Sequence, residues 1–137
     1  MPRFMLDPQL AASTVRLVRW KLSDVLLSTD ATYPWLLLVP RRAGAVELTD
    51  LAWTDAVTLT AEARRASQAL AELFRPHKIN VAAIGNQVSQ LHVHVVARFR
   101  DDPAWPRPIW AVVPRRTYEP GALDERRRIL AARLTQA

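Results

Sequence analysis

The chain has 137 residues, 50% of them hydrophobic, and it contains no cysteine. This length fits one domain with a single core, and the lack of cysteine excludes disulfides and cysteine-ligated zinc. The formal net charge of +6 comes almost entirely from arginine, which favours polyanionic partners such as nucleotides or nucleic acid. Neither a leader-like apolar segment at the N-terminus nor a membrane-spanning run is evident, so we expect a cytoplasmic protein.

Three strands are predicted before the first long helix. Apolar and polar residues alternate over 14–20, as in a half-buried strand, and residues 24–29 form a second strand. The continuous apolar run WLLLV at 35–39 is typical of a strand buried on both faces, and Pro40 ends it. The polar residues 28–34 are typical of a connecting turn.

A long amphipathic helix is predicted over residues 48–74, with Asp50 capping its first turn. Two further strands are expected at 79–84 and 91–99, joined by a turn at 85–87 that begins with glycine. A turn this short joins antiparallel neighbours in a hairpin.

The C-terminal part combines an irregular loop with a short helix. Four prolines and two tryptophans within residues 101–114 exclude long regular structure. This loop either covers one end of the sheet or closes over a ligand. Residues 124–134 are predicted to form an amphipathic helix. The order of elements predicts an α+β fold, with a five-stranded, mainly antiparallel sheet and one long and one short helix. We expect one domain over 1–137, with 101–137 as its loop and C-terminal helix.

Two of the three histidines lie one residue apart in the segment QLHVHVV at 90–96. Because side chains alternate along a strand, Gln90, His92 and His94 share one face, and Leu91 and Val93 share the other. The two imidazoles would lie roughly 6–7 Å apart, a spacing that suits one small anion or one metal ion. No acidic residue projects from this strand, so a metal site would need a ligand from the following loop.

The segment INVAAIGNQVSQLHVHVVAR at 79–98 resembles the signature of the histidine-triad (HIT) superfamily of nucleotide hydrolases and transferases. In that signature, three histidines alternate with apolar residues after an asparagine-containing strand and a glycine turn. A weaker resemblance extends over about residues 14–100. The resemblance implies a five-stranded antiparallel sheet, a homodimer, and a purine nucleotide or dinucleotide as substrate.

The resemblance also implies roles for individual residues. The middle histidine, His92, would attack an α-phosphate, and water or another acceptor would resolve the nucleotidyl-histidine. A backbone carbonyl of the glycine turn would hold its second nitrogen, and His94 would donate to phosphate oxygens. No metal on the protein and no cofactor is expected, and Mg²⁺ would arrive only with the substrate. The family positions for contacts to phosphate or ribose are occupied by Asn80, Gly85, Gln87 and Asp30.

Two residues depart from the family pattern. Gln90 replaces the first histidine of the triad; it keeps a donor and an acceptor but carries no titrating proton, and we expect it to support catalysis as a donor. Trp35 replaces a histidine before the third strand, where an indole could stack on a base or pack in the core. The chain looks like a bacterial HIT subgroup in which a QLHVHV strand is followed by RFRDDPAWP.

Three functions remain open from the sequence. The first is a hydrolase or transferase acting on dinucleoside polyphosphates, nucleoside phosphoramidates or adenylated small molecules. The second is a nucleotide-binding protein without turnover, which the two departures motivate. The third is a basic nucleic-acid-binding domain, for which binding would fall steeply with salt.

Overall fold

The computed structural model describes residues 2–136 and contains one five-stranded sheet in the order β1-β2-β3-β5-β4. Every neighbouring pair of strands is antiparallel, which confirms the predicted α+β fold. The strands are β1 (Thr14–Arg19), β2 (Ser23–Ser28), β3 (Trp35–Pro40), β4 (Lys78–Ala82) and β5 (Val93–Arg98). The helices are α1 (Pro8–Ala12), α2 (Trp53–Phe74) and α3 (Ala122–Leu134). Within residues 2–136, no helix has the length and apolar character needed to cross a membrane.

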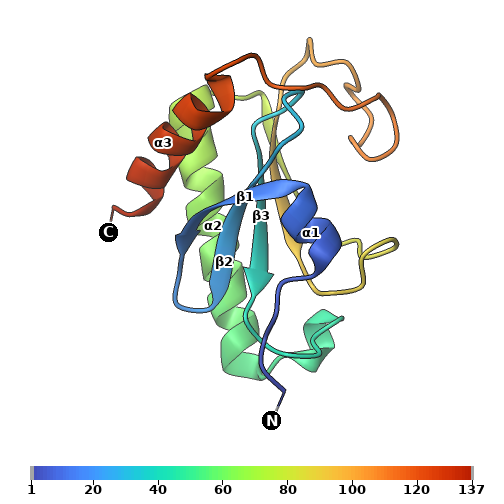
Figure 1. Ribbon diagram of the computed structural model, residues 1–137, viewed down its shortest axis with the longest axis vertical. Helices are drawn as coiled ribbons and strands as arrows, with labels where there is room; N and C mark the ends of the chain where they lie inside the picture. The colour runs from blue at the N-terminus through green and yellow to red at the C-terminus, as the bar shows by residue number, and fades with distance from the viewer. Residues whose placement is uncertain (1, 137) are drawn as a thin grey trace.

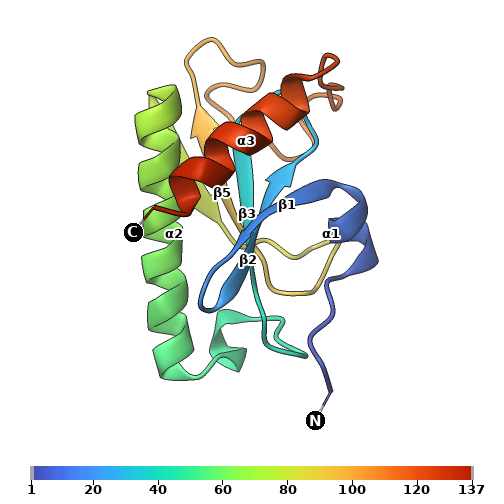
Figure 2. The same cartoon turned by 60° about the vertical axis from the view of Figure 1, so that its left-hand side comes forward.

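One face of the sheet is covered by α2 and α3, which lie against each other (Figures 1 and 2). Leu59 and Leu70 of α2 and Leu130 of α3 pack there against Val25 and Val95 of the strands. All five side chains are buried because each element turns its apolar stripe to this layer. This layer forms the main core of the molecule.

The opposite face is covered in two separate parts. At one part, Leu10 of α1 packs on Leu26 and Leu37, together with residues of the N-terminal segment. At the other part, the loop after β5 packs Ile109 on Val96. Figure 1 shows α1 and this orange loop on the same side of the sheet, away from α2 and α3. The region between the two parts holds the histidines.

Strand β5 has the alternation that the sequence predicts. Val93 and Val95 belong to the core under α2. His94 pairs in register with Leu37 of β3, and Leu37 belongs to the cluster under α1 on the opposite face. The two histidines therefore point away from the main core.

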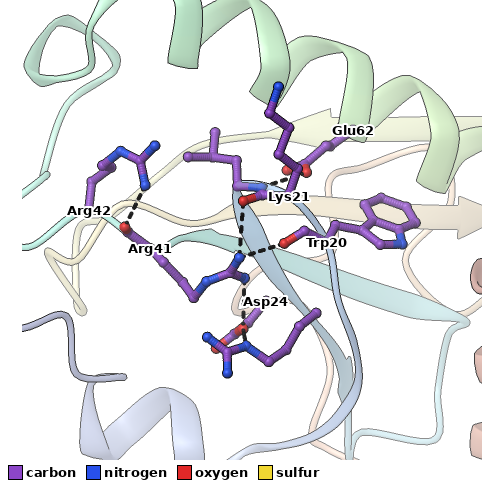
Figure 3. A network of polar contacts seen from close by, with 8 residues as sticks. Trp20, Lys21, Asp24, Arg41, Arg42 and Glu62 are labelled. Atoms are coloured by element: carbon purple, nitrogen blue, oxygen red, sulfur yellow. Dashed lines mark hydrogen bonds and ion pairs between the residues drawn. The ribbon is translucent and has the colours of Figure 1, made fainter.

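A polar network closes the end of the sheet where β1 turns into β2 (Figure 3). Arg41, directly after β3, donates to the carbonyl oxygen of Trp20 at 2.5 Å and to Asp24 Oδ1 at 3.0 Å. Glu62 of α2 accepts from the backbone N–H of Leu22 at 3.1 Å. These bonds satisfy backbone groups of the turn and tie the hairpin to α2.

The long helix begins later than predicted. Leu48–Asp50 form a 3₁₀ turn, and α2 starts at Trp53 with Ala52 as its N-cap. The carboxylate of Asp50 accepts from the backbone N–H groups of Val46 at 3.0 Å and Glu47 at 2.8 Å. It therefore stabilises the turn before α2, and the prediction that it caps the long helix is wrong.

The connection between β4 and β5 is longer than the predicted turn. Strand β4 ends at Ala82 and β5 begins at Val93, so residues 83–92 form a wide loop, and His92 lies at its end. Helix α1 was not predicted; Asp7 caps it by accepting from the backbone N–H of Gln9 at 2.8 Å. An Asp-Pro pair before an apolar residue is a helix-start signal that could have identified it.

Candidate active site

The imidazole of His92 is anchored at one nitrogen. Its Nδ1 lies 2.6 Å from the backbone carbonyl oxygen of Gln90. A carbonyl can only accept, so Nδ1 carries the proton and Nε2 keeps a free lone pair. The predicted anchor was a carbonyl of the glycine turn; the structure places it two residues before His92 in the same segment.

The imidazole of His94 is anchored by a residue of another strand. The indole Nε1 of Trp35, on β3, donates to His94 Nδ1 at 2.9 Å. Burial, followed by the neighbouring His92, lowers the pKa of His94 from 6.5 to about 3. The ring of His94 is therefore neutral at ordinary pH.

The two histidine rings lie close together. Their centroids are 4.8 Å apart in a T-shaped arrangement, closer than the roughly 6–7 Å that the strand rise predicts. Each residue is only 6% exposed. The pair forms part of the wall of a cavity.

This cavity has a volume of about 380 Å³, within the range of about 300–1,000 Å³ typical of small-molecule sites. Trp35 and Trp110 line it, and their ring centroids lie 5.6 Å and 5.2 Å from that of His94. The complete lining consists of Trp35, Ile84, Gly85, Asn86, Gln87, Val88, His92, His94, Trp110 and Ala111. A second cavity of about 210 Å³ also reaches His92, so this residue lies between two hollows.

Two predicted phosphate-binding residues lie in the same cavity as the histidines. Gly85 and Gln87 belong to the wide loop after β4 and line it. Gly85 has a φ of +70°, and a Cβ there would meet only the Val88 carbonyl oxygen, at an ordinary contact distance of 3.6 Å. The glycine is thus required for its backbone conformation rather than for space.

Three other predicted site residues are engaged elsewhere. The Gln90 side chain donates to the carbonyl oxygen of Met5 and accepts from the backbone N–H of Asp7, both at 2.8 Å. It fastens the N-terminal segment instead of facing the cavity. The donor and the acceptor of the Gln90 amide both bond to the protein's own backbone, and these bonds account for the position of the side chain.

Asn80 and Asp30 are likewise held by other residues and do not line the cavity. Asn80 Oδ1 accepts from Arg98 at 2.9 Å. Asp30 is 6% exposed and accepts from the backbone N–H of Thr32 at 3.0 Å and of Arg116 at 3.1 Å. Their predicted contacts with phosphate and ribose stay predictions.

Arg98, at the end of the histidine strand, points into the protein and not toward the cavity. The residue is 1% exposed, and its guanidinium pairs with Asp102. That pairing also removes Asp102 as a metal ligand. Within residues 2–136, no three His, Asp or Glu side chains gather in the manner of a metal site.

The Pro- and Trp-rich loop packs on the sheet and reaches the cavity, and its closing over a ligand stays a prediction. Ile109 covers Val96 at one end of the sheet, while Trp110 lines the cavity. Ala111 beside it has a φ of 60°, which is uncommon for a residue other than glycine. The Pro- and Trp-rich sequence predicts a loop, but it does not indicate which of the two tryptophans reaches the site.

Residues 10–101 match the family model described as the HIT domain. The chain belongs to the HIT family. Membership in this family points to a nucleotide-binding protein with chemistry of the hydrolase type.

Solved HIT structures are similar over nearly the whole chain. A histidine triad protein from Bradyrhizobium japonicum is 41% identical with a TM-score of 0.94, and the match covers 97% of this chain and 99% of that one. A histidine triad protein from Marinobacter aquaeolei is 40% identical with a TM-score of 0.93, and the match covers 97% of each chain. No curated protein matches the sequence.

Proposed function

We propose that this HIT protein is a nucleotide hydrolase or nucleotidyl transferase that acts at an α-phosphate through a covalent intermediate on His92. One observation carries the proposal. The 2.6 Å contact to the Gln90 carbonyl oxygen leaves Nε2 as the nucleophilic nitrogen of a ring that lines the cavity. A neutral imidazole is a good nucleophile near pH 7, since its ordinary pKa is about 6.5.

The reaction would proceed in two displacements. The lone pair of His92 Nε2 attacks the α-phosphorus, and the bond to the leaving group breaks with its electron pair going to that group, which takes a proton from solvent. The imidazole then carries a positive charge, which the Gln90 carbonyl oxygen stabilises through the Nδ1 hydrogen. Water or another acceptor attacks phosphorus next and loses a proton to solvent, and the N–P bond breaks to regenerate neutral His92.

Charge on the phosphoryl oxygens would be met by donors around the cavity. His94 lies beside His92, and the loop with Gly85 and Gln87 forms an adjoining wall. Preorganised donors of this kind supply much of the catalysis in phosphoryl transfer. No lysine or arginine is among the lining residues. Trp35 and Trp110 offer flat apolar surfaces to a purine base.

Mass spectrometry of a quenched reaction tests the proposal. The protein is incubated with a fluorogenic adenosine phosphoramidate, and separately with diadenosine polyphosphates. We expect a nucleotide adduct on the peptide that contains His92, and loss of both adduct and turnover in His92→Ala and His92→Gly. His77→Ala is the matched control, because His77 is the one histidine outside the cavity. Full turnover by His92→Ala would refute the nucleophile.

A second candidate is a nucleotide-binding protein that senses without turnover. It is favoured by the contacts of Gln90, because its amide holds the N-terminal segment and offers nothing to a substrate. Binding of AMP, with no His92-dependent turnover of either substrate, would select this function.

We also propose that the protein forms a homodimer through the free edge of β4. Val81 on this edge strand is 52% exposed, and Ile84 just beyond it is 39% exposed. Trp53 and Val57 at the start of α2 are 81% and 53% exposed. An unpaired strand edge and exposed apolar side chains are features that pairing with a second copy would cover.

A further inference from the structure

The two histidines of the cavity differ in the chemistry of their anchors. His92 Nδ1 meets a carbonyl oxygen, which only accepts hydrogen bonds. His94 Nδ1 meets the indole Nε1–H of Trp35, which only donates. Opposite anchors select opposite tautomers, because a neutral imidazole carries its single proton on one nitrogen or the other.

We propose that Trp35 is a positioning residue that holds His94 as the neutral tautomer with its proton on Nε2. His94 then presents a permanent N–H donor beside the free lone pair of His92. This inference rests on the proposed function for the acceptor of that hydrogen bond: His94 Nε2–H would donate to a phosphoryl oxygen of the substrate. It also gives a role to the replacement at position 35, since a histidine there could donate or accept whereas tryptophan only donates.

The same contact excludes the charged form of His94. Protonation of Nδ1 would set two N–H groups against each other across 2.9 Å and remove the hydrogen bond. The residue is 6% exposed, so water does not compensate the charge. The lowered pKa of His94 agrees with this geometry.

One other histidine lies in the surroundings of His94. His92 is next to it on the same segment, and Trp35 of β3 and Trp110 of the loop contact its ring from the other elements. Tyr33 lies behind Trp35, and its pKa is raised, first by burial and then by the nearby Asp102, so it stays neutral. Indole faces attract cations, but neither indole compensates the lost Nδ1 hydrogen bond.

NMR of nitrogen-labelled protein tests the tautomers without any substrate. We expect His94 to carry hydrogen on Nε2 and not on Nδ1, and to stay neutral over about pH 5 to 8, the range in which an ordinary histidine titrates. A scalar coupling across the hydrogen bond should connect Trp35 Nε1 with His94 Nδ1. A doubly protonated His94, or one protonated on Nδ1, overturns the proposal.

Trp35→Phe removes the donor but keeps an aromatic ring. We expect His94 to populate both tautomers in this variant and its pKa to rise, because the buried Nδ1 has lost its partner. Trp110→Phe is the matched control: its ring also contacts His94, but its indole nitrogen has no partner in the structure. The tautomer of His94 should be unchanged in Trp110→Phe. If Trp35→Phe does not fold, the scalar coupling between Trp35 Nε1 and His94 Nδ1 in the unaltered protein decides whether the proposal holds.

Activity provides a separate readout. We expect kcat/KM of Trp35→Phe to fall by about tenfold to a hundredfold, less than the roughly 10²–10³-fold loss when an oxyanion donor is removed outright. The acid limb of the pH profile of kcat/KM for this variant should also show a second ionisation, that of His94. Absence of nucleotide turnover in the unaltered protein, with His94 in the expected tautomer, would reject the proposed function and leave the role of Trp35 standing. Turnover with His94 protonated on Nδ1 would support the proposed function and reject the role of Trp35.

Discussion

Arg98, the last residue of β5, and Asp102 form a two-point ion pair with N–O distances of 2.8 and 3.0 Å. Their side chains are 2% and 5% exposed. Asp102 also accepts from the backbone N–H of Trp105 at 2.8 Å, which fixes the start of the loop. The pair therefore anchors the loop that carries Trp110 to the strand that carries His94.

Removal of the carboxylate at position 102 should destabilise the fold strongly. Asp102→Ala leaves the buried guanidinium of Arg98 without its counter-charge, which costs about 3–5 kcal/mol for a buried pair. Urea denaturation measures the loss. Glu125→Ala is the control, since its pair with Arg128 is 57% and 69% exposed and exposed pairs contribute about 0–1 kcal/mol. Equal losses in the two variants would contradict the anchoring role.

Acid should destabilise the protein through His94. Its folded pKa is lowered from 6.5 to about 3, first by burial and then by His92. Between these values the unfolded chain binds a proton that the native state does not, so the free energy of unfolding falls as pH falls. One group contributes up to about 1.4 kcal/mol per pH unit.

Denaturant unfolding at several pH values checks this dependence. His94→Gln removes the titrating group, so its stability should fall less between about pH 7 and pH 5 than that of the unaltered protein. His77→Gln, at an exposed histidine, should retain the original slope. Identical slopes in all three proteins would show that His94 is not the group responsible.

The sequence predicted the sheet and the orientation of the histidine strand because both depend on local periodicity. Val93 and Val95 entered the core and His94 faced away from it, as alternation requires. The position of Gly85 beside the histidines followed from the family resemblance. Its positive φ fits the glycine turn that the resemblance includes.

The contacts that define the site could not be predicted because they join residues far apart in the chain. Trp35 and His94 are separated by 59 positions, and Gln90 and Met5 by 85. Such pairs depend on strand register and on the path of the N-terminal segment. A polar residue type shows that a partner is required, but it does not show whether that partner is a ligand or another part of the chain.

The proposed dimer should dissociate when a charge is placed on the free strand edge. Val81→Lys puts an ammonium group on β4, and edge lysines oppose strand pairing. We expect sedimentation equilibrium to show a dimer for the unaltered protein and a monomer for Val81→Lys. Met5→Lys is the control, because Met5 is 79% exposed but lies in the N-terminal segment. A monomeric unaltered protein would contradict the proposed pairing.

Placing a histidine at position 90, as in the full triad, should not raise the proposed activity. Gln90→His removes the amide that bonds both Met5 and Asp7, and a single imidazole tautomer cannot reproduce that donor and acceptor pair in the same geometry. Loss of a typical hydrogen bond costs about 0.5–1.5 kcal/mol. We therefore expect lower stability, faster hydrogen exchange at the backbone N–H of Asp7, and no gain in kcat/KM. The backbone carbonyl of residue 90 is unaltered by the substitution, so the anchor of His92 should persist. A rise in turnover with unchanged exchange at Asp7 would mean that residue 90 acts on the substrate.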